Sequence, residues 1–244
     1  VGYEPKGEFL ENGISINRKE NDDLTILLRA SMLCTNAYYD GKSVIGDTTE
    51  GALIVTAAKA GMAKKDMEVL YPRVHEVPFT SERKRMTTVH KTPEGKLVAY
   101  VKGAPEVILE RSTHILKYGQ AKKLSAKEKK TVLETNERMA SDALRVLGVA
   151  YKELSDNDPA DINEDSVEKD LVFVGLTGMI DPPREEAKEA NQKCQQAGIK
   201  TVMITGDHKL TAVAIAKELG MLKSAMVLTG AELDKMSDEE FKKI

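Results

Sequence analysis

The feature that most constrains the fold is an alternation of apolar runs and amphipathic segments in residues 171–220. The apolar run LVFVGLTGMI (171–180) precedes residues 181–198, whose early prolines, first-turn acidic residues and final glycine are typical of a helix. A second apolar run, IKTVMIT (199–205), is followed by a turn and by LTAVAIAKELG (210–220), which predicts another helix closed by a glycine. Strand, helix, strand and helix in this order predict a βαβ unit on a parallel sheet.

Residues before about position 175 show a different pattern. Several segments carry a capping residue or a proline ahead of an amphipathic run, which is the usual start of a helix. They are residues 22–39 behind an Asp cap, the D-T-T-E segment from Asp47, the segment opened by Pro105, and the long polar segment from the capping box at Ser125 to near Leu144.

Antiparallel pairing is expected in the same region. Residues 86–102 place two β-rich runs around a Pro-Glu-Gly turn, which predicts a β-hairpin. Residues 145–151 predict a further strand, and the acidic stretch 153–170 is expected to be a solvated loop. The expected fold class is therefore α/β and α+β. Residues 1–178 would form a mixed, largely antiparallel sheet with flanking helices, and residues 179–244 would belong to a doubly wound parallel-sheet domain.

Composition excludes several classes of function. A formal net charge of -3 provides no basic face for a duplex, so no nucleic-acid partner is expected. Cys34 and Cys194 match no zinc or redox spacing and are expected to be reduced thiols in a cytosolic setting, and the histidines show no metal-ligand grouping. The longest apolar stretch, 171–180, has about half of the ~20 residues needed to cross a bilayer, so the chain by itself is expected to be soluble. It begins without an initiator Met or a signal peptide, which suggests a piece of a longer protein.

A short segment after the second apolar run is a candidate phosphate site. Thr205, Gly206 and Asp207 follow the carboxyl end of a predicted strand and lead into a helix N-terminus, where free N–H groups favour phosphate. The Thr205 hydroxyl can donate to a phosphoryl oxygen, and Asp207 can sit near Mg²⁺. For the bare triplet, an ordinary turn is the favoured explanation, with Gly206 for its geometry and Asp207 as the helix cap.

The order of several segments along the chain is more specific. GDTTEGAL, VPFTSERKRM, VKGAPE, ALRVLGVAY, DPPR and TGD follow one another as they do in the cytoplasmic region of the P-type ATPases. The chain resembles that family, and within it most closely the calcium-pump-like branch. The resemblance implies a nucleotide-binding domain in residues 1–178. It also implies, in residues 179–244, part of a phosphorylation domain of the haloacid-dehalogenase-like type.

The resemblance also implies a reaction for the intact protein. Pumps of this family pass phosphate from ATP to the Asp of a DKTGT motif, and a GDGxND segment completes the Mg²⁺ site. Neither motif occurs in this chain, and the family order places them before residue 1 and after residue 244. We therefore expect a fragment that does not turn over ATP alone. In the intact membrane protein, this cytoplasmic region would work with transmembrane and actuator domains of the same chain in cation transport, with calcium as the favoured ion.

A nucleotide site follows from the same resemblance. Phe79 resembles the residue that stacks on adenine, Lys102 the pocket lysine with Gly103 beside it, and Glu50 the carboxylate near the adenine amine. The positions that match phosphate contacts are Lys84, Arg145 and, in the DPPR hinge, Arg184. Ser81 stands where calcium pumps commonly have an Arg, so the phosphate contact of this loop is assigned to Lys84.

Each assignment has a plainer alternative. Phe79 can be a core anchor, Glu50 can be the third residue of a capping box, and Lys84 and Arg145 can be surface charges. Lys102 ends an apolar run, so if it is buried it needs a partner or an anion.

Two other functions compete with an ATP-binding fragment. A free-standing haloacid-dehalogenase-type phosphatase needs an Asp nucleophile, for which Asp47 is the candidate, but the second Asp two residues on is missing. An interaction module without a nucleotide site is the other alternative. Retention of Lys102, Gly103 and the Thr205 segment favours the ATP-binding fragment over it.

Overall fold

The computed structural model describes residues 3–18, 21–142, 144–154, 162–180, 185–205, 209–222 and 226–241. The chain divides into two compact units. The larger consists of Gly2–Asn136 with Val146–Met179, and the smaller of Glu137–Arg145 with Ile180–Ile244 and Val1. Each unit is described by itself.

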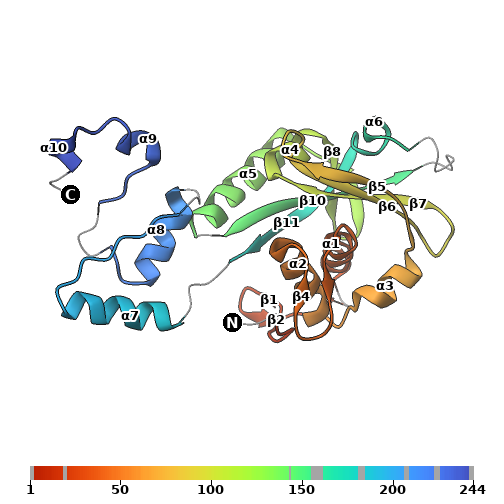
Figure 1. Cartoon of the computed structure of the whole chain (residues 1–244). Coiled ribbons are helices and arrows are strands. Elements are labelled where there is room, and N and C mark those ends of the chain that lie inside the picture. Colours follow the sequence, from red (N-terminus) through yellow and green to blue (C-terminus); the bar gives the residue numbers. More distant parts are fainter. Residues whose placement is uncertain are drawn as a thin grey trace. The chain divides into compact units, whose positions relative to one another are not determined.

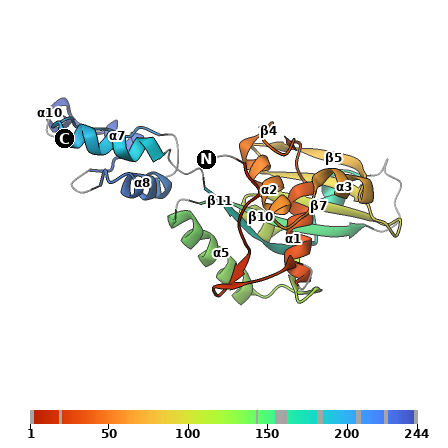
Figure 2. The same cartoon turned by 90° about the horizontal axis from the view of Figure 1, so that it is seen from below.

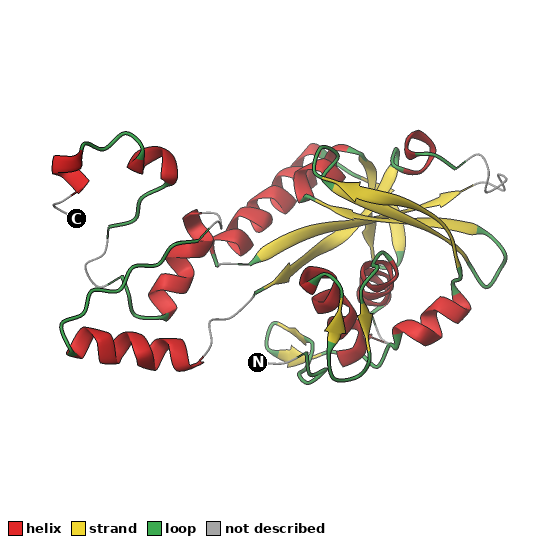
Figure 3. Ribbon diagram, viewed as in Figure 1, coloured by secondary structure: helices red, strands yellow, loops and turns green. Residues whose placement is uncertain are grey.

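The larger unit is built on a seven-stranded sheet with the order β5-β6-β7-β10-β11-β8-β9 (Figure 3). Its strands are β5 (Arg73–Thr80), β6 (Arg85–Lys91), β7 (Leu97–Gly103), β8 (Ser112–Lys117), β9 (Gln120–Lys123), β10 (Arg145–Leu154) and β11 (Leu171–Met179). Antiparallel pairs join β5 to β6, β6 to β7, β7 to β10 and β8 to β9, whereas β11 and β8 are parallel. The prediction of a mixed, largely antiparallel sheet with flanking helices is confirmed.

Helices cover both faces of this sheet (Figures 1 and 2). They are α1 (Asp22–Leu33), α2 (Thr48–Lys59), α3 (Lys64–Leu70), α4 (Pro105–Glu110), α5 (Ala126–Ser141) and α6 (Glu164–Val167), with short hairpins β1 (Leu10–Glu11) to β2 (Ile14–Ser15) and β3 (Tyr38–Tyr39) to β4 (Val44–Ile45). Leu33 of α1 packs with Val98 and Tyr100 of β7, whereas Ile108 of α4 packs with Val101. Successive strand residues point to opposite faces, so Lys102 lies on the α1 face.

Several predicted elements are confirmed. The hairpin is β6 and β7, and Pro105 is the first residue of α4. Asp47 caps α2 by accepting from the Glu50 N–H at 3.0 Å. Ser125 and Glu128 form a reciprocal capping box at the start of α5.

Other expectations for this unit are wrong in detail. The first helix is capped by Asn21 and ends at Leu33, not at Tyr39. At its end the carbonyls of Leu33 and Thr35 accept from the side chain of Arg73. The stretch 153–170 contains α6, which has its own capping box between Asn163 and Ser166. Residues 155–161 lie outside the described residues.

The smaller unit contains α7 (Glu185–Gln196), α8 (Lys209–Glu218), α9 (Gly230–Leu233) and α10 (Asp238–Phe241). The helices predicted after residue 181 and residue 209 are present as α7 and α8, although residues 181–184 lie outside the described part. The strand predicted at 199–205 is absent. Ile199, Val202 and Ile204 are exposed, at 57%, 75% and 92%. Among the described residues, no strand pairs with this run.

The apolar run 171–180 was expected to begin a βαβ unit. It forms β11, which lies in the sheet of the larger unit beside β10 and β8. A βαβ unit is therefore not formed within the described residues. Among these residues, no helix combines the length and the apolar character needed to span a membrane.

Candidate nucleotide site

Lys102 and Glu50 form an ion pair at the end of β7. The Lys102 Nζ donates to Glu50 Oε1 at 2.5 Å, and the two side chains are 9% and 14% exposed. Lys102 is the sixth residue of an otherwise buried strand, so its ammonium group must be neutralised locally. The partner that the sequence could not name is Glu50, from the first turn of α2.

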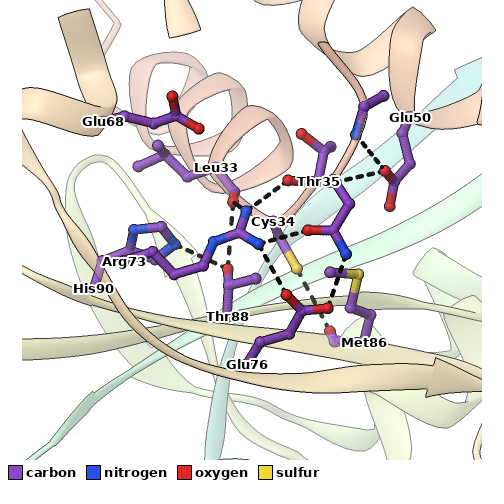
Figure 4. Close-up of polar contacts among 12 residues, drawn as sticks. Leu33, Cys34, Thr35, Glu50, Glu68, Arg73, Glu76, Met86, Thr88 and His90 are labelled. Atoms are coloured by element: carbon purple, nitrogen blue, oxygen red, sulfur yellow. Dashed lines mark hydrogen bonds and ion pairs between the residues drawn. The ribbon is translucent and has the colours of Figure 1, made fainter. Parts of the chain in front are cut away.

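The loop after α1 holds the other oxygen of Glu50 (Figure 4). Glu50 Oε2 accepts from the backbone N–H groups of Asn36 at 2.6 Å and Ala37 at 2.9 Å. Its carboxylate is therefore not the reciprocal half of a capping box with Asp47. Burial alone would raise the pKa of Glu50, but the Lys102 ammonium and these N–H groups together lower it. Glu50 is consequently an anion at neutral pH.

Arg73 of β5 fixes this loop (Figure 4). Its guanidinium donates to the carbonyls of Leu33 at 3.0 Å and Thr35 at 2.5 Å, and to Asn36 Oδ1 at 2.6 Å. Glu76 accepts from Arg73 at 3.0 Å and from Asn36 Nδ2 at 2.8 Å. Sequence reasoning missed Arg73, because its partners in the loop after α1 lie 37 to 40 residues away.

Phe79 lies level with Lys102 along the sheet. Val77 pairs with Thr87 and Thr80 with Arg85, which leaves Pro78 and Phe79 together opposite Met86. Met86 in turn pairs with Lys102. Phe79 is thus two strands, or about 10 Å, from the β7 backbone. Phe79 as a residue is 58% exposed, so it is not a core anchor.

Gly103 is required by the chain's own packing. A Cβ at this position would lie 2.4 Å from the Lys84 carbonyl oxygen and 2.7 Å from Arg85 Cβ. The turn between β5 and β6 therefore crosses directly over Gly103. Ala104 N–H donates to the same Lys84 carbonyl at 3.0 Å. Lys84 itself has a φ of 53° and an exposed side chain.

The neighbouring arginines of this turn point to a different partner. Arg83 and Arg85 donate to the two oxygens of Glu168, at 2.8 and 2.6 Å, and Thr87 donates to it at 2.7 Å. Glu168 is fully buried. It was missed because it stands in the acidic stretch expected to be a loop, more than 80 residues from these partners.

Cys34 lies beside the ion pair but does not compete with Glu50 for the Lys102 ammonium. Its Sγ contacts the Met86 carbonyl oxygen at 3.5 Å, and burial raises the pKa of the thiol. The thiol is therefore neutral, and the Lys102 charge remains matched to Glu50. Both cysteines are free.

The remaining predicted site residues belong to the smaller unit or lie outside the described residues. Arg145 is the exposed first residue of β10, and Thr205 is an exposed residue of the smaller unit. Arg184, Gly206 and Asp207 lie outside the described residues. Within the described part of the chain, no three His, Cys, Asp or Glu side chains are grouped as metal ligands.

A mixed sheet with helices on both faces defines a mixed α/β module, in which a buried lysine lies near the end of β7. A family model for the P-type ATPase cytoplasmic domain N matches residues 23–186. The chain therefore belongs to the P-type ATPases and contains their cytoplasmic N domain, which confirms the resemblance.

Several similar proteins are named calcium-transporting ATPases. Calcium-transporting ATPase 1 of Bacillus cereus is 44% identical over 232 residues, which cover 95% of this chain and 25% of that protein. The calcium-transporting ATPase of Bacillus subtilis is 42% identical over 245 residues, covering 98% of this chain and 27% of the relative. Calcium-transporting ATPase 1 of Saccharomyces cerevisiae is 41% identical over 227 residues, covering 90% and 24%. The chain thus spans about a quarter of the length of these relatives.

Proposed function

We propose that the larger unit binds ATP at the sheet end that carries Glu50, Phe79 and Lys102. The observation that carries this proposal is the buried ammonium of Lys102 on β7, level with the exposed aromatic residue Phe79 two strands away on β5. The ring offers a stacking face for adenine, the ammonium an electrostatic partner for phosphate, and Glu50 an acceptor for the exocyclic amine. Gly103 keeps the backbone beside Lys102 compact.

Exposed Lys84 and Arg145 are the groups we assign to the phosphates. Arg83 and Arg85 are committed to Glu168, which supports the assignment of the turn's phosphate contact to Lys84. Mg²⁺ would accompany the nucleotide.

For the intact protein, we propose ATP hydrolysis through an aspartyl-phosphate, coupled to cation transport across a membrane with this region on the cytoplasmic side. The names of the relatives favour calcium. The transmembrane and actuator domains of the same full-length chain are the proposed partners.

The smaller unit is proposed to be part of a haloacid-dehalogenase-like phosphorylation domain, with its boundary near residue 179. Thr205, Gly206 and Asp207 would contribute to its catalytic centre, and Arg184 would reach the nucleotide from the hinge. The exposed apolar residues Val202 and Ile204 support this assignment, since they have the character of a strand that pairs with other parts of the intact protein. The alternative phosphatase loses its candidate nucleophile, because Asp47 caps α2.

Titration of the chain with a non-hydrolysable ATP analogue and Mg²⁺, followed by calorimetry and amide chemical shifts, tests the site. Phe79→Ala is expected to weaken binding about five- to a hundredfold, because stacking of a base on an aromatic ring contributes ~1–3 kcal/mol. Lys102→Met is expected to weaken binding more for a nucleotide with three phosphates than for one with a single phosphate. Tyr118→Ala, which removes the ring of a residue that is 89% exposed, is the matched control. Equal affinities for all these proteins would exclude the site.

A further inference from the structure

The turn that carries Phe79 is held by a buried side chain of its own. Arg83 Nη1 donates to Glu168 Oε1 at 2.8 Å, and Arg83 Nη2 donates to the carbonyl oxygen of Pro78, the residue before Phe79. The Arg83 side chain is 13% exposed. Both ends of its guanidinium fork are therefore used inside the protein.

Glu168 gives this contact a rigid anchor. Its carboxylate also accepts from Arg85 Nε at 2.6 Å and from Thr87 Oγ1 at 2.7 Å. Thr87 precedes Thr88, whose hydroxyl faces the α1 side, so the Glu168 network lies on the opposite face from Lys102. Charge-assisted bonds of this kind are short and geometrically specific, and Arg83 Nε adds an ion pair with Glu164 Oε1 at 3.6 Å.

Pro78 lies where the regular pairing of β5 with β6 is interrupted. Proline has no N–H to donate, and the two-to-one pairing of Pro78 and Phe79 against Met86 forms a β-bulge. A bulge redirects the side chains that follow it, at the cost of regular hydrogen bonds. The Pro78 carbonyl belongs to the planar peptide group that leads to the Phe79 Cα. A donor that fixes this carbonyl therefore fixes the direction in which Phe79 leaves the strand.

We propose that Arg83, anchored by Glu168, is a positioning residue for the Phe79 ring in nucleotide binding. The inference rests on the proposed stacking of adenine on Phe79. Arg83 acts on the base through the peptide of Pro78 and makes no contact with the phosphates. A phosphate-contacting arginine in the same turn would behave differently in two respects. Its effect would grow with the number of phosphates, and it would persist without the Phe79 ring.

The test is a double-mutant cycle measured with AMP, ADP and ATP. Arg83→Lys retains the positive charge but loses the planar fork that reaches Pro78 and Glu168 together. We expect it to weaken all three nucleotides by the same factor, about two- to tenfold, which is the range for loss of one hydrogen bond. In the Phe79→Ala background, Arg83→Lys is expected to change affinity less than about twofold.

Arg111→Lys is the matched control, because Arg111 donates to the Glu168 carbonyl at 3.3 Å and has no bond to the Phe79 turn. Its nucleotide affinities should equal those of the unchanged chain. Urea unfolding of each variant establishes that it is folded under the binding conditions, and Glu168→Gln, which releases Arg83 from its other end, should repeat the Arg83→Lys pattern.

The outcomes separate the two proposals. If Phe79→Ala leaves affinity unchanged, the stacking site itself is wrong. If Phe79→Ala weakens binding but Arg83→Lys has no effect, or has an effect that persists without Phe79 or grows from AMP to ATP, the positioning role of Arg83 is wrong while the site stands.

Discussion

Removing the two charges of the Glu50–Lys102 ion pair one at a time should lower stability by different amounts. Glu50→Gln and Lys102→Met each remove one charge and retain the approximate volume of the side chain. Glu50 keeps two backbone donors, at 2.6 and 2.9 Å, when Lys102 is replaced. Within the described part of the chain, Glu50 is the acceptor of the Lys102 ammonium, so Glu50→Gln leaves a buried cation without an anion.

The magnitudes follow from these partners. Lys102→Met removes one charge-assisted hydrogen bond, which corresponds to a loss of about 2 kcal/mol in the free energy of unfolding. Glu50→Gln should cost about 3 kcal/mol or more, because breaking a buried pair from one side leaves a desolvated charge. The double variant should cost less than the sum of the two, with a coupling energy of about 2 kcal/mol.

Urea unfolding monitored by circular dichroism measures these values. The slope against urea should stay constant within the set, so that changes in midpoint report stability. Lys130→Met, on the exposed face of α5, serves as the control and should leave the midpoint unchanged, since its ion pair with Glu134 is 78% and 62% exposed. Additive losses below about 0.5 kcal/mol for the two site variants would mean that the pair is solvent-screened and that the site is not buried.

Two further predictions concern the same sheet. Gly103→Ala should lower stability by about 1–3 kcal/mol in thermal unfolding, because the new Cβ meets the Lys84 carbonyl oxygen at 2.4 Å. Gly175→Ala is the control and should be tolerated, since the nearest contact of its new Cβ is at 3.5 Å. Equal losses of stability in the two variants would contradict the packing at Gly103. His90 is buried, which lowers its pKa from 6.5 to about 4. The unfolded chain therefore binds the His90 proton more strongly than the folded chain does, so stability should fall by roughly 3 kcal/mol as pH drops from 6.5 to 4. In urea unfolding at different pH values, His90→Gln should show a smaller fall in stability over this range.

Elements with local signals were predictable from the sequence. Asp47 and Ser125 cap their helices, Pro105 opens α4, and the Pro-Glu-Gly turn joins β6 to β7, because each depends on residues within a few positions. The sequence predicts that Lys102 needs a partner or an anion if it is buried. The structure shows that Lys102 is buried and that its partner is the Glu50 carboxylate. Strand character in residues 73–80 was missed, since proline and charged residues interrupt the alternation there.

Features set by distant residues were not predictable. The first helix ends at Leu33, whose carbonyl accepts from Arg73, 40 residues further on. The buried role of Glu168 depends on Arg83 and Arg85, and no local pattern marks it within the acidic stretch. For residues 199–205, the apolar pattern predicts a strand, but a strand requires neighbours, and among the described residues none pairs with it.

The two polar networks act on opposite faces of the same sheet end. On the α1 face, the Asn36 and Ala37 N–H groups orient Glu50 and, through it, Lys102. On the other face, Glu168 anchors the turn that precedes β6. Neither network depends on a nucleotide for its hydrogen bonds, so the proposed binding surface would be organised before a ligand arrives. A preorganised surface loses little conformational entropy on binding. Nucleotide affinity of the larger unit should therefore respond more to the positions of its side chains than to any ordering of its backbone.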